Sequence, residues 1–80
     1  MERSDTVKTV NIDETGKKLK RMRKAKGLST YQVRDMLNLT SRGAIYKWER
    51  GECLPRVDNL LILADIYGVS MEEMLVICEV

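Results

Sequence analysis

Histidine and phenylalanine are absent from this chain, which has one tryptophan, one proline and two cysteines. Two cysteines without a histidine cannot supply the four ligands of a structural zinc site. The lack of histidine also leaves only carboxylates and lysines for general acid–base chemistry, and no group of residues indicates catalysis. We therefore expect a protein that is not an enzyme and that uses neither a metal nor a cofactor.

Long apolar runs are missing as well. No run approaches the roughly 18 residues of a membrane helix, and no signal-peptide pattern follows Met1. Cys53 and Cys78 lack CxxC spacing, which favours reduced thiols used as small apolar residues. With 80 residues, 44% of them hydrophobic, one small domain is expected. We expect it to be soluble and cytoplasmic, with no membrane partner and no small-molecule ligand.

The net charge of +2 conceals an uneven distribution. Residues 17–56 hold twelve Lys and Arg against three acids, a local net charge of +9. The rest of the chain holds two basic residues against nine acids, a net charge of −7. This pattern favours a polyanionic partner for the basic segment. A solvated charged face on a small helical protein would look similar, so charge alone leaves both interpretations open.

A first helix is expected over residues 12–26, capped by Asn11 and ended by Gly27. Its apolar stripe includes Leu19. Arg23 lies four residues later on the same side, where a guanidinium needs a partner.

Two short helices are expected next. Ser29 begins an S-x-x-Q capping box, which predicts a second helix over residues 30–37. Thr40 or Ser41 then caps a third helix, which ends at Gly51. Two short helices joined by a tight turn indicate a helix-turn-helix.

The third helix, in the run SRGAIYKWERG from Ser41 to Gly51, is expected to have two different faces. At 100° per residue, one side carries Ala44, Ile45 and Trp48. The other side is basic and rich in hydrogen-bonding groups: Arg42, Gly43, Tyr46, Lys47 and Arg50.

Beyond Pro55, a fourth helix is expected over residues 57–67. Its predicted core stripe consists of Val57, Leu60, Leu61, Ala64 and Tyr67. Ile62 and Ile66 lie nearly opposite, and a helix that is apolar on most sides is either central or covered by a partner.

A fifth short helix follows a second capping box at Ser70, and it carries Met71, Met74 and Leu75. The last residues, LVICEV, are more typical of a strand. Residues 6–10 are consistent with either a short strand or a mobile arm.

The chain resembles the helix-turn-helix family of the phage lambda repressor and Cro. Two runs carry the resemblance, GLSTYQVRDMLNLTSRGAIYKWERGECLP and DNLLILADIYGVSMEEML. The most specific part is AIYKWERG followed by LP. The resemblance implies an all-α, five-helix DNA-binding domain over residues 12–77, with short strands at the ends as an open question. Residues 1–11 are then an N-terminal arm and residues 78–80 a C-terminal tail.

The resemblance also implies which residues contact DNA. The base-reading positions of the family fall on Arg42, Gly43, Tyr46 and Lys47. The phosphate-contacting positions fall on Ser29, Thr30, Tyr31, Arg50 and Arg56. The family pairs an arginine of the first helix with a glutamate of the third, and Arg23 and Glu49 match that structural ion pair.

Three features depart from the family pattern. One extra residue lies between Leu37 and Trp48, which lengthens the turn or the start of the third helix and shifts the base-contact register by up to one position. Arg34 stands where the family prefers a small residue, so it either turns outward toward phosphate or uses the room of the longer turn. Ile62 and Ile66 stand where the family often has polar or small residues.

The last departure suggests how the protein assembles. One hypothesis is a homodimer whose interface consists of Ile62, Ile66, Met71 and Met74. The alternative is that Val7, Val10, Val76 and Ile77 fold back within one chain and cover the same surface.

We therefore predict a transcription regulator, in the first instance a repressor. It binds double-stranded DNA specifically as a homodimer with its third helix in the major groove. The alternative function is an antitoxin-like or adaptor role, in which the fourth and fifth helices bind another protein.

Overall fold

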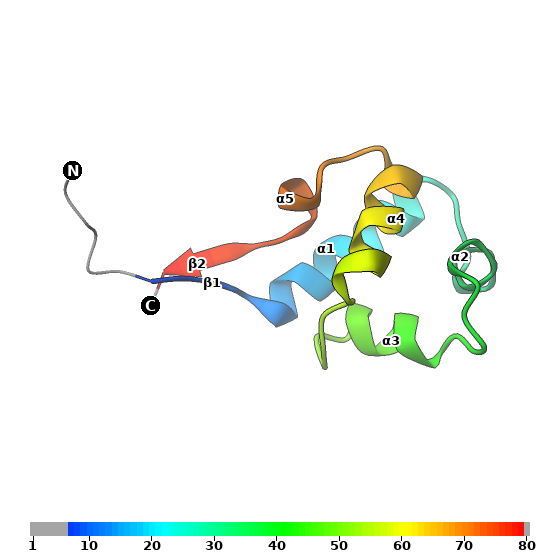
Figure 1. Cartoon of the computed structure of the whole chain (residues 1–80), viewed down its shortest axis with the longest axis horizontal. Coiled ribbons are helices and arrows are strands. Elements are labelled where there is room, and N and C mark those ends of the chain that lie inside the picture. Colours follow the sequence, from blue (N-terminus) through cyan, green and yellow to red (C-terminus); the bar gives the residue numbers. More distant parts are fainter. Residues whose placement is uncertain (1–6, 80) are drawn as a thin grey trace.

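The computed structural model describes residues 7–79, which form five helices and two short strands (Figure 1). In chain order these are β1 (Lys8–Val10), α1 (Ile12–Ala25), α2 (Thr30–Leu37), α3 (Gly43–Glu49), α4 (Val57–Tyr67), α5 (Met71–Met74) and β2 (Ile77–Glu79). The helices form one body, from which the paired strands extend (Figure 1). The expected helical class is confirmed.

Most helix ends lie where capping residues predict them. Asn11 Oδ1 accepts a hydrogen bond from the Glu14 N–H at 3.0 Å at the start of α1. Ser29 and Gln32 form the expected capping box, with hydrogen bonds of 3.1 and 2.8 Å. The same motif at Ser70 begins α5. Because these signals are local, α2 has the bounds that the sequence predicts.

The start of α3 corrects the prediction that Thr40 or Ser41 caps this helix. The N-cap is Arg42, which makes no side-chain capping bond. Ser41 Oγ instead accepts a hydrogen bond from the Gly43 N–H at 3.3 Å, within the turn. The helix therefore begins later than its capping-type residues suggest.

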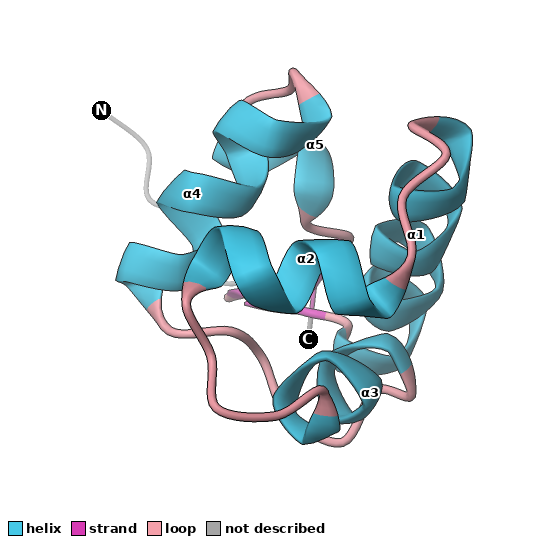
Figure 2. Ribbon diagram, turned by 90° about the vertical axis from the view of Figure 1, so that its right-hand side faces the viewer, coloured by secondary structure: helices cyan, strands magenta, loops and turns pink. Residues whose placement is uncertain are grey.

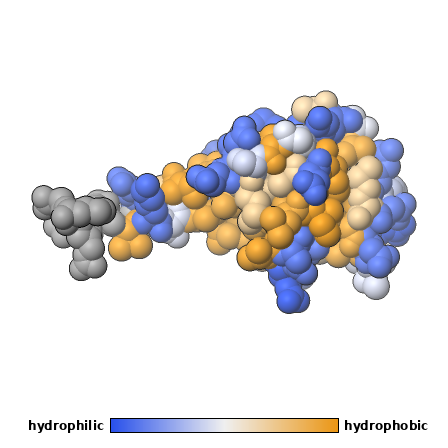
Figure 3. Space-filling model, turned by 45° about the horizontal axis from the view of Figure 1, so that its top comes forward, coloured by the Kyte–Doolittle hydropathy of each residue, from blue (hydrophilic) through white to orange (hydrophobic). Residues whose placement is uncertain are grey.

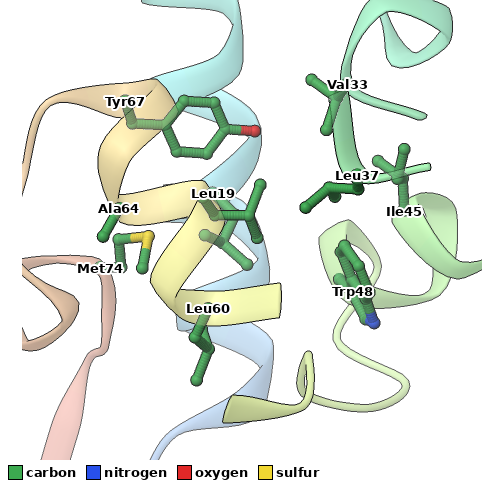
Figure 4. Close-up of a cluster of buried hydrophobic side chains, with 10 residues drawn as sticks. Leu19, Val33, Leu37, Ile45, Trp48, Leu60, Ala64, Tyr67 and Met74 are labelled. Carbon is green, nitrogen blue, oxygen red and sulfur yellow. The ribbon is translucent and has the colours of Figure 1, made fainter. Parts of the chain in front are cut away.

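All five helices contribute to one buried core (Figure 4). Its members are Leu19, Val33, Leu37, Ile45, Trp48, Leu60, Leu63, Ala64, Tyr67 and Met74.

The helix α4 turns a different face to this core than predicted. Val57 and Leu61 were expected in the core stripe but are 66% and 54% exposed, whereas Leu63 is 1% exposed. The observed stripe has regular i, i+3, i+4, i+7 spacing and consists of Leu60, Leu63, Ala64 and Tyr67. Because residues 60–63 are all apolar, periodicity alone fits either stripe.

The residues expected at a dimer surface do not all lie at the surface. Met74 is fully buried, so the prediction that it contributes to an interface is wrong. Met71 and Ile66 are partly buried and pack against the core. Ile62 remains exposed. The helix α5 therefore serves the core of its own chain through Met74.

The two terminal segments form an antiparallel ribbon, so the strand interpretation is confirmed for residues 8–10, while Thr6 lies outside the described residues. The paired residues are Lys8 with Glu79, Thr9 with Cys78, and Val10 with Ile77. The Val76 N–H donates to Thr15 Oγ1 at 2.9 Å and connects the ribbon to α1. The ribbon extends away from the helical body (Figure 1), and Val57, Leu61 and Ile62 of α4 stay exposed.

The helix α1 crosses α3 at very short range. A Cβ atom built on Gly16 would lie 2.5 Å from the Trp48 carbonyl oxygen and 2.8 Å from that of Glu49. Only glycine permits this approach of the two backbones.

Next to this crossing, Arg23 and Glu49 form a bidentate ion pair. Arg23 Nε and Nη2 donate to the two Glu49 carboxylate oxygens at 2.7 and 3.0 Å. Nη1 donates to the Leu28 carbonyl at 2.9 Å. The hydrogen bond with Glu49 raises the pKa of Arg23, against the opposing effect of burial. Burial and the Glu49 charge raise the pKa of Tyr67 to about 12. The predicted partner of Arg23 is therefore present, and the pair joins α1 to α3.

Replacing Glu49 with Gln is expected to destabilise the fold by about 3 kcal/mol, because Arg23 would be left buried without its counter-charge. Urea unfolding followed by Trp48 fluorescence measures this change. The matched control is Glu52→Gln, which alters the Arg50–Glu52 pair, whose side chains are 63% and 49% exposed. That control should cost less than about 1 kcal/mol, and equal costs for the two variants would contradict the role of the buried pair.

Candidate nucleic-acid interface

The helix α3 has the two faces that its sequence predicts. Ile45 and Trp48 are buried in the core. On the other side, Gly43, Tyr46 and Lys47 are exposed. Arg42, at the N-cap, is partly exposed. The residues expected to read bases therefore share one accessible surface, which lies beside α2 (Figure 2).

The side chain of Arg42 is held against α2. Its guanidinium carbon lies 3.6 Å from the centre of the Tyr31 ring and 5.5 Å from that of Tyr46. Nη1 donates to Thr30 Oγ1 at 3.4 Å, and the same oxygen lies 3.4 Å from the Tyr46 hydroxyl. Two residues expected to read bases thus meet two residues expected to contact phosphate. Spacing along one helix could not reveal this cluster, because its members come from two helices.

The start of α2 adds backbone and hydroxyl donors to this surface. Ser29 Oγ accepts from the Gln32 N–H within the capping box, so its own hydrogen remains available to donate. The first-turn N–H groups of Thr30 and Tyr31 have no acceptor within the helix. An anion bound at this end would also be favoured by the helix dipole.

The remaining basic candidates lie on α2, on α3 and at the start of α4. Lys47 and Arg56 are exposed, and Arg56 is the N-cap of α4. Arg50 is exposed and pairs with Glu52 at 2.6 Å, which neutralises part of its charge. Arg34 lies at the surface of α2 and pairs with its neighbour Asp35 at 2.7 Å. Of the two placements open for Arg34, the outward one is observed, and its partner there is a carboxylate.

Other kinds of site find no support within residues 7–79. No group of three or more Cys, Asp and Glu residues could hold a metal ion, and no pocket occurs there. No helix in this part of the chain is long and apolar enough to cross a membrane. Both cysteines are free thiols; Cys53 is exposed and so does not pack as an apolar residue, and Cys78 is partly exposed.

Comparison with known sequences agrees with this geometry. The helix-turn-helix family matches residues 19–74. The HTH-type transcriptional activator BcrR of Enterococcus faecalis is 34% identical over 62 residues, which make up 78% of this chain and 30% of BcrR. This chain therefore spans less than a third of the length of that relative.

Solved structures of transcription regulators are similar to this chain in both fold and sequence. The restriction-modification controller protein C.AhdI from Aeromonas hydrophila has a TM-score of 0.70 and 28% identity, over 79% of this chain and 94% of that chain. The DNA-binding domain of BldD from S. venezulae has a TM-score of 0.68 and 31% identity, over 82% of this chain and 97% of that chain. These likenesses are to DNA-binding regulators and not to enzymes. Because the family matches most of the chain and the third helix has one buried and one exposed face, the chain belongs to the Cro/C1-type helix-turn-helix family of DNA-binding transcription regulators.

Proposed function

We propose that this protein binds a specific double-stranded DNA sequence as a homodimer, with α3 in the major groove. The observation that carries the proposal is the exposed face of α3, where Arg42, Tyr46 and Lys47 present donors while the opposite face is buried. A major groove about 12 Å wide accepts an α-helix. The basic balance of residues 17–56 suits the phosphate backbone, whose contacts supply affinity without sequence information.

Arg42, Gly43 and Lys47 each have a proposed role in base reading. Arg42 would donate to guanine O6 and N7, and Lys47 to the same edge of a neighbouring base. A Cβ atom at Gly43 would meet only Ser41 Oγ, at 3.4 Å, so the fold does not require glycine there. We propose that Gly43 instead lets the backbone come close to the DNA.

Phosphate contacts are proposed at both ends of this surface. The first turn of α2 supplies the Ser29 hydroxyl and the N–H groups of Thr30 and Tyr31. Arg50 at the C-cap of α3 and Arg56 at the N-cap of α4 are the other proposed contacts. Binding would break the Arg50–Glu52 pair, which costs little because both side chains are well exposed.

The dimer contact is proposed on α4. Hydrophobic residues cover much of the helical body in Figure 3, and α4 exposes Val57, Leu61 and Ile62. Ile66 and Met71 border this surface as partly buried residues. A two-fold axis would place the two α3 helices in successive major grooves, about 34 Å apart. Isologous contact between two such apolar surfaces is the usual way in which small proteins dimerise.

Repression is the proposed direction of regulation, because a bound dimer needs only to occupy a promoter in order to block it. BcrR is named as a transcriptional activator, so the direction proposed for this protein is opposite to that of this relative. Since its proposed ligand is genomic DNA, the protein would act in the cytoplasm of a bacterial host.

Removing two base-reading side chains tests the DNA proposal. Arg42→Ala with Lys47→Ala should weaken binding to a sequence selected from random DNA by about a hundredfold, because each good base contact is worth about 1–3 kcal/mol. Fluorescence anisotropy over a series of salt concentrations measures the affinity. Wild-type affinity should fall steeply with salt.

The matched control removes one arginine and one lysine elsewhere, with Arg21→Ala and Lys8→Ala. Both residues are exposed, Lys8 on the ribbon and Arg21 on α1. This control should keep the sequence preference of the wild type. An affinity that is independent of salt, or an unchanged Arg42/Lys47 variant, would show that the proposed function is wrong.

Sedimentation tests the dimer. The 9.2 kDa chain should sediment at twice that mass at micromolar concentration, and Leu61→Asp with Ile62→Asp should yield a folded monomer because two charges would enter the apolar contact. Ile77→Asp is the matched control, since Ile77 is similarly exposed but lies on the ribbon. A wild-type monomer would refute the dimer proposal.

The same exposed residues of α4 favour a second candidate, an antitoxin-like or adaptor role in which another protein covers α4 and α5. A wild-type monomer that forms a stoichiometric complex with a co-expressed partner, and loses that complex through Leu61→Asp, would support it.

A further inference from the structure

We propose that the side chain of Tyr31 positions Arg42 for base reading and does not itself contact phosphate. The inference rests on the proposed function, because it concerns how Arg42 meets DNA. It reassigns the role that the family resemblance implies for Tyr31. The observation behind it is the short distance of 3.6 Å between the Arg42 guanidinium carbon and the centre of the Tyr31 ring.

Stacking uses the flat face of a guanidinium and leaves its edge free. A guanidinium carries five N–H donors, all in its plane, so a ring below that plane blocks none of them. Within residues 7–79, Nη1 is the one donor of Arg42 that has a hydrogen-bond partner, the Thr30 hydroxyl at 3.4 Å. The edge formed by Nε and Nη2 is therefore available as a pair of parallel donors. Such a pair matches the two acceptors of guanine in the major groove.

The surroundings hold this arrangement before DNA arrives. Thr30 is buried in the first turn of α2 and contacts both Arg42 and the Tyr46 hydroxyl. Tyr31 is 53% exposed, and its ring covers the Arg42 guanidinium more closely than that of Arg34, whose central carbon lies 5.8 Å from the ring centre. An unsupported arginine would lose much rotamer freedom on binding, and a stacked arginine has already lost part of it. The ring of Tyr31 thus lowers the entropic cost of base contact.

The two roles for Tyr31 depend on different parts of its side chain. Positioning Arg42 needs the aromatic ring, whereas a phosphate contact needs the hydroxyl group. Tyr31→Phe removes the hydroxyl and keeps the ring, and Tyr31→Ala removes both. A phosphate contact affects all DNA sequences alike, whereas loss of Arg42 placement affects one base pair.

The experiment first selects sequences from random DNA with the wild type and with Arg42→Ala. The base pair whose preference disappears in Arg42→Ala is the one that Arg42 reads. At that pair, Tyr31→Ala should reduce the preference for guanine by about tenfold, while Tyr31→Phe should keep it within about twofold. Affinity for mixed DNA and its salt dependence should stay unchanged in both. Met36→Ala is the matched control, because Met36 lies on the same helix and is 50% exposed.

NMR of the free protein gives an independent reading. The δ-methylene protons of Arg42 should be shifted upfield by the Tyr31 ring in the wild type and in Tyr31→Phe, and this shift should disappear in Tyr31→Ala. Its absence from the wild type would overturn the inference.

The outcomes separate this inference from the proposed function. A base preference that depends on Arg42 but survives Tyr31→Ala would refute the inference and leave the proposed function standing. Equal loss of affinity for all DNA in Tyr31→Phe and Tyr31→Ala would identify a phosphate contact and also refute it. A wild type without any base preference would refute the proposed function, and the inference with it.

Discussion

The bidentate ion pair between Arg23 and Glu49 is the interaction on which the rest of this structure depends. The helix α3 has only seven residues and is too short to persist without tertiary contacts. Glu49 connects its C-terminal end to α1, where Gly16 lets the two backbones meet. A buried pair adds little net stability over apolar packing, but leaving one partner unpaired is costly. The pair therefore penalises any other orientation of α3 relative to α1.

Because the ion pair fixes α3 against α1, it also determines which face of α3 is exposed. With Ile45, Trp48 and Glu49 committed to the domain, only the face with Arg42, Tyr46 and Lys47 is left for a partner. The start of α2 lies beside that face and holds Arg42 in place. Family membership makes DNA the partner class, and the arrangement accounts for how so small a helix can present its side chains in a defined geometry.

Much of the fold follows from local signals in the sequence. Capping boxes predict the starts of α2 and α5, and the burial of Arg23 follows from its position after Leu19. The sequence could not predict which face of α4 is buried, because residues 60–63 are all apolar. Only packing against the other helices selects Leu63 over Leu61 for the core. The start of α3 and the stacking of Arg42 depend on contacts between elements, for which a single sequence carries no periodic pattern.

The central claim is that α3 is fastened on one side and reads DNA with the other. An NMR titration of the backbone amides with the selected DNA tests it most directly. Shift changes should be concentrated in residues 29–31 and on the outward residues of α3, with Arg23 and Leu63 almost unaffected. Changes concentrated on α4 and α5, with the outward residues of α3 unmoved, would contradict the account.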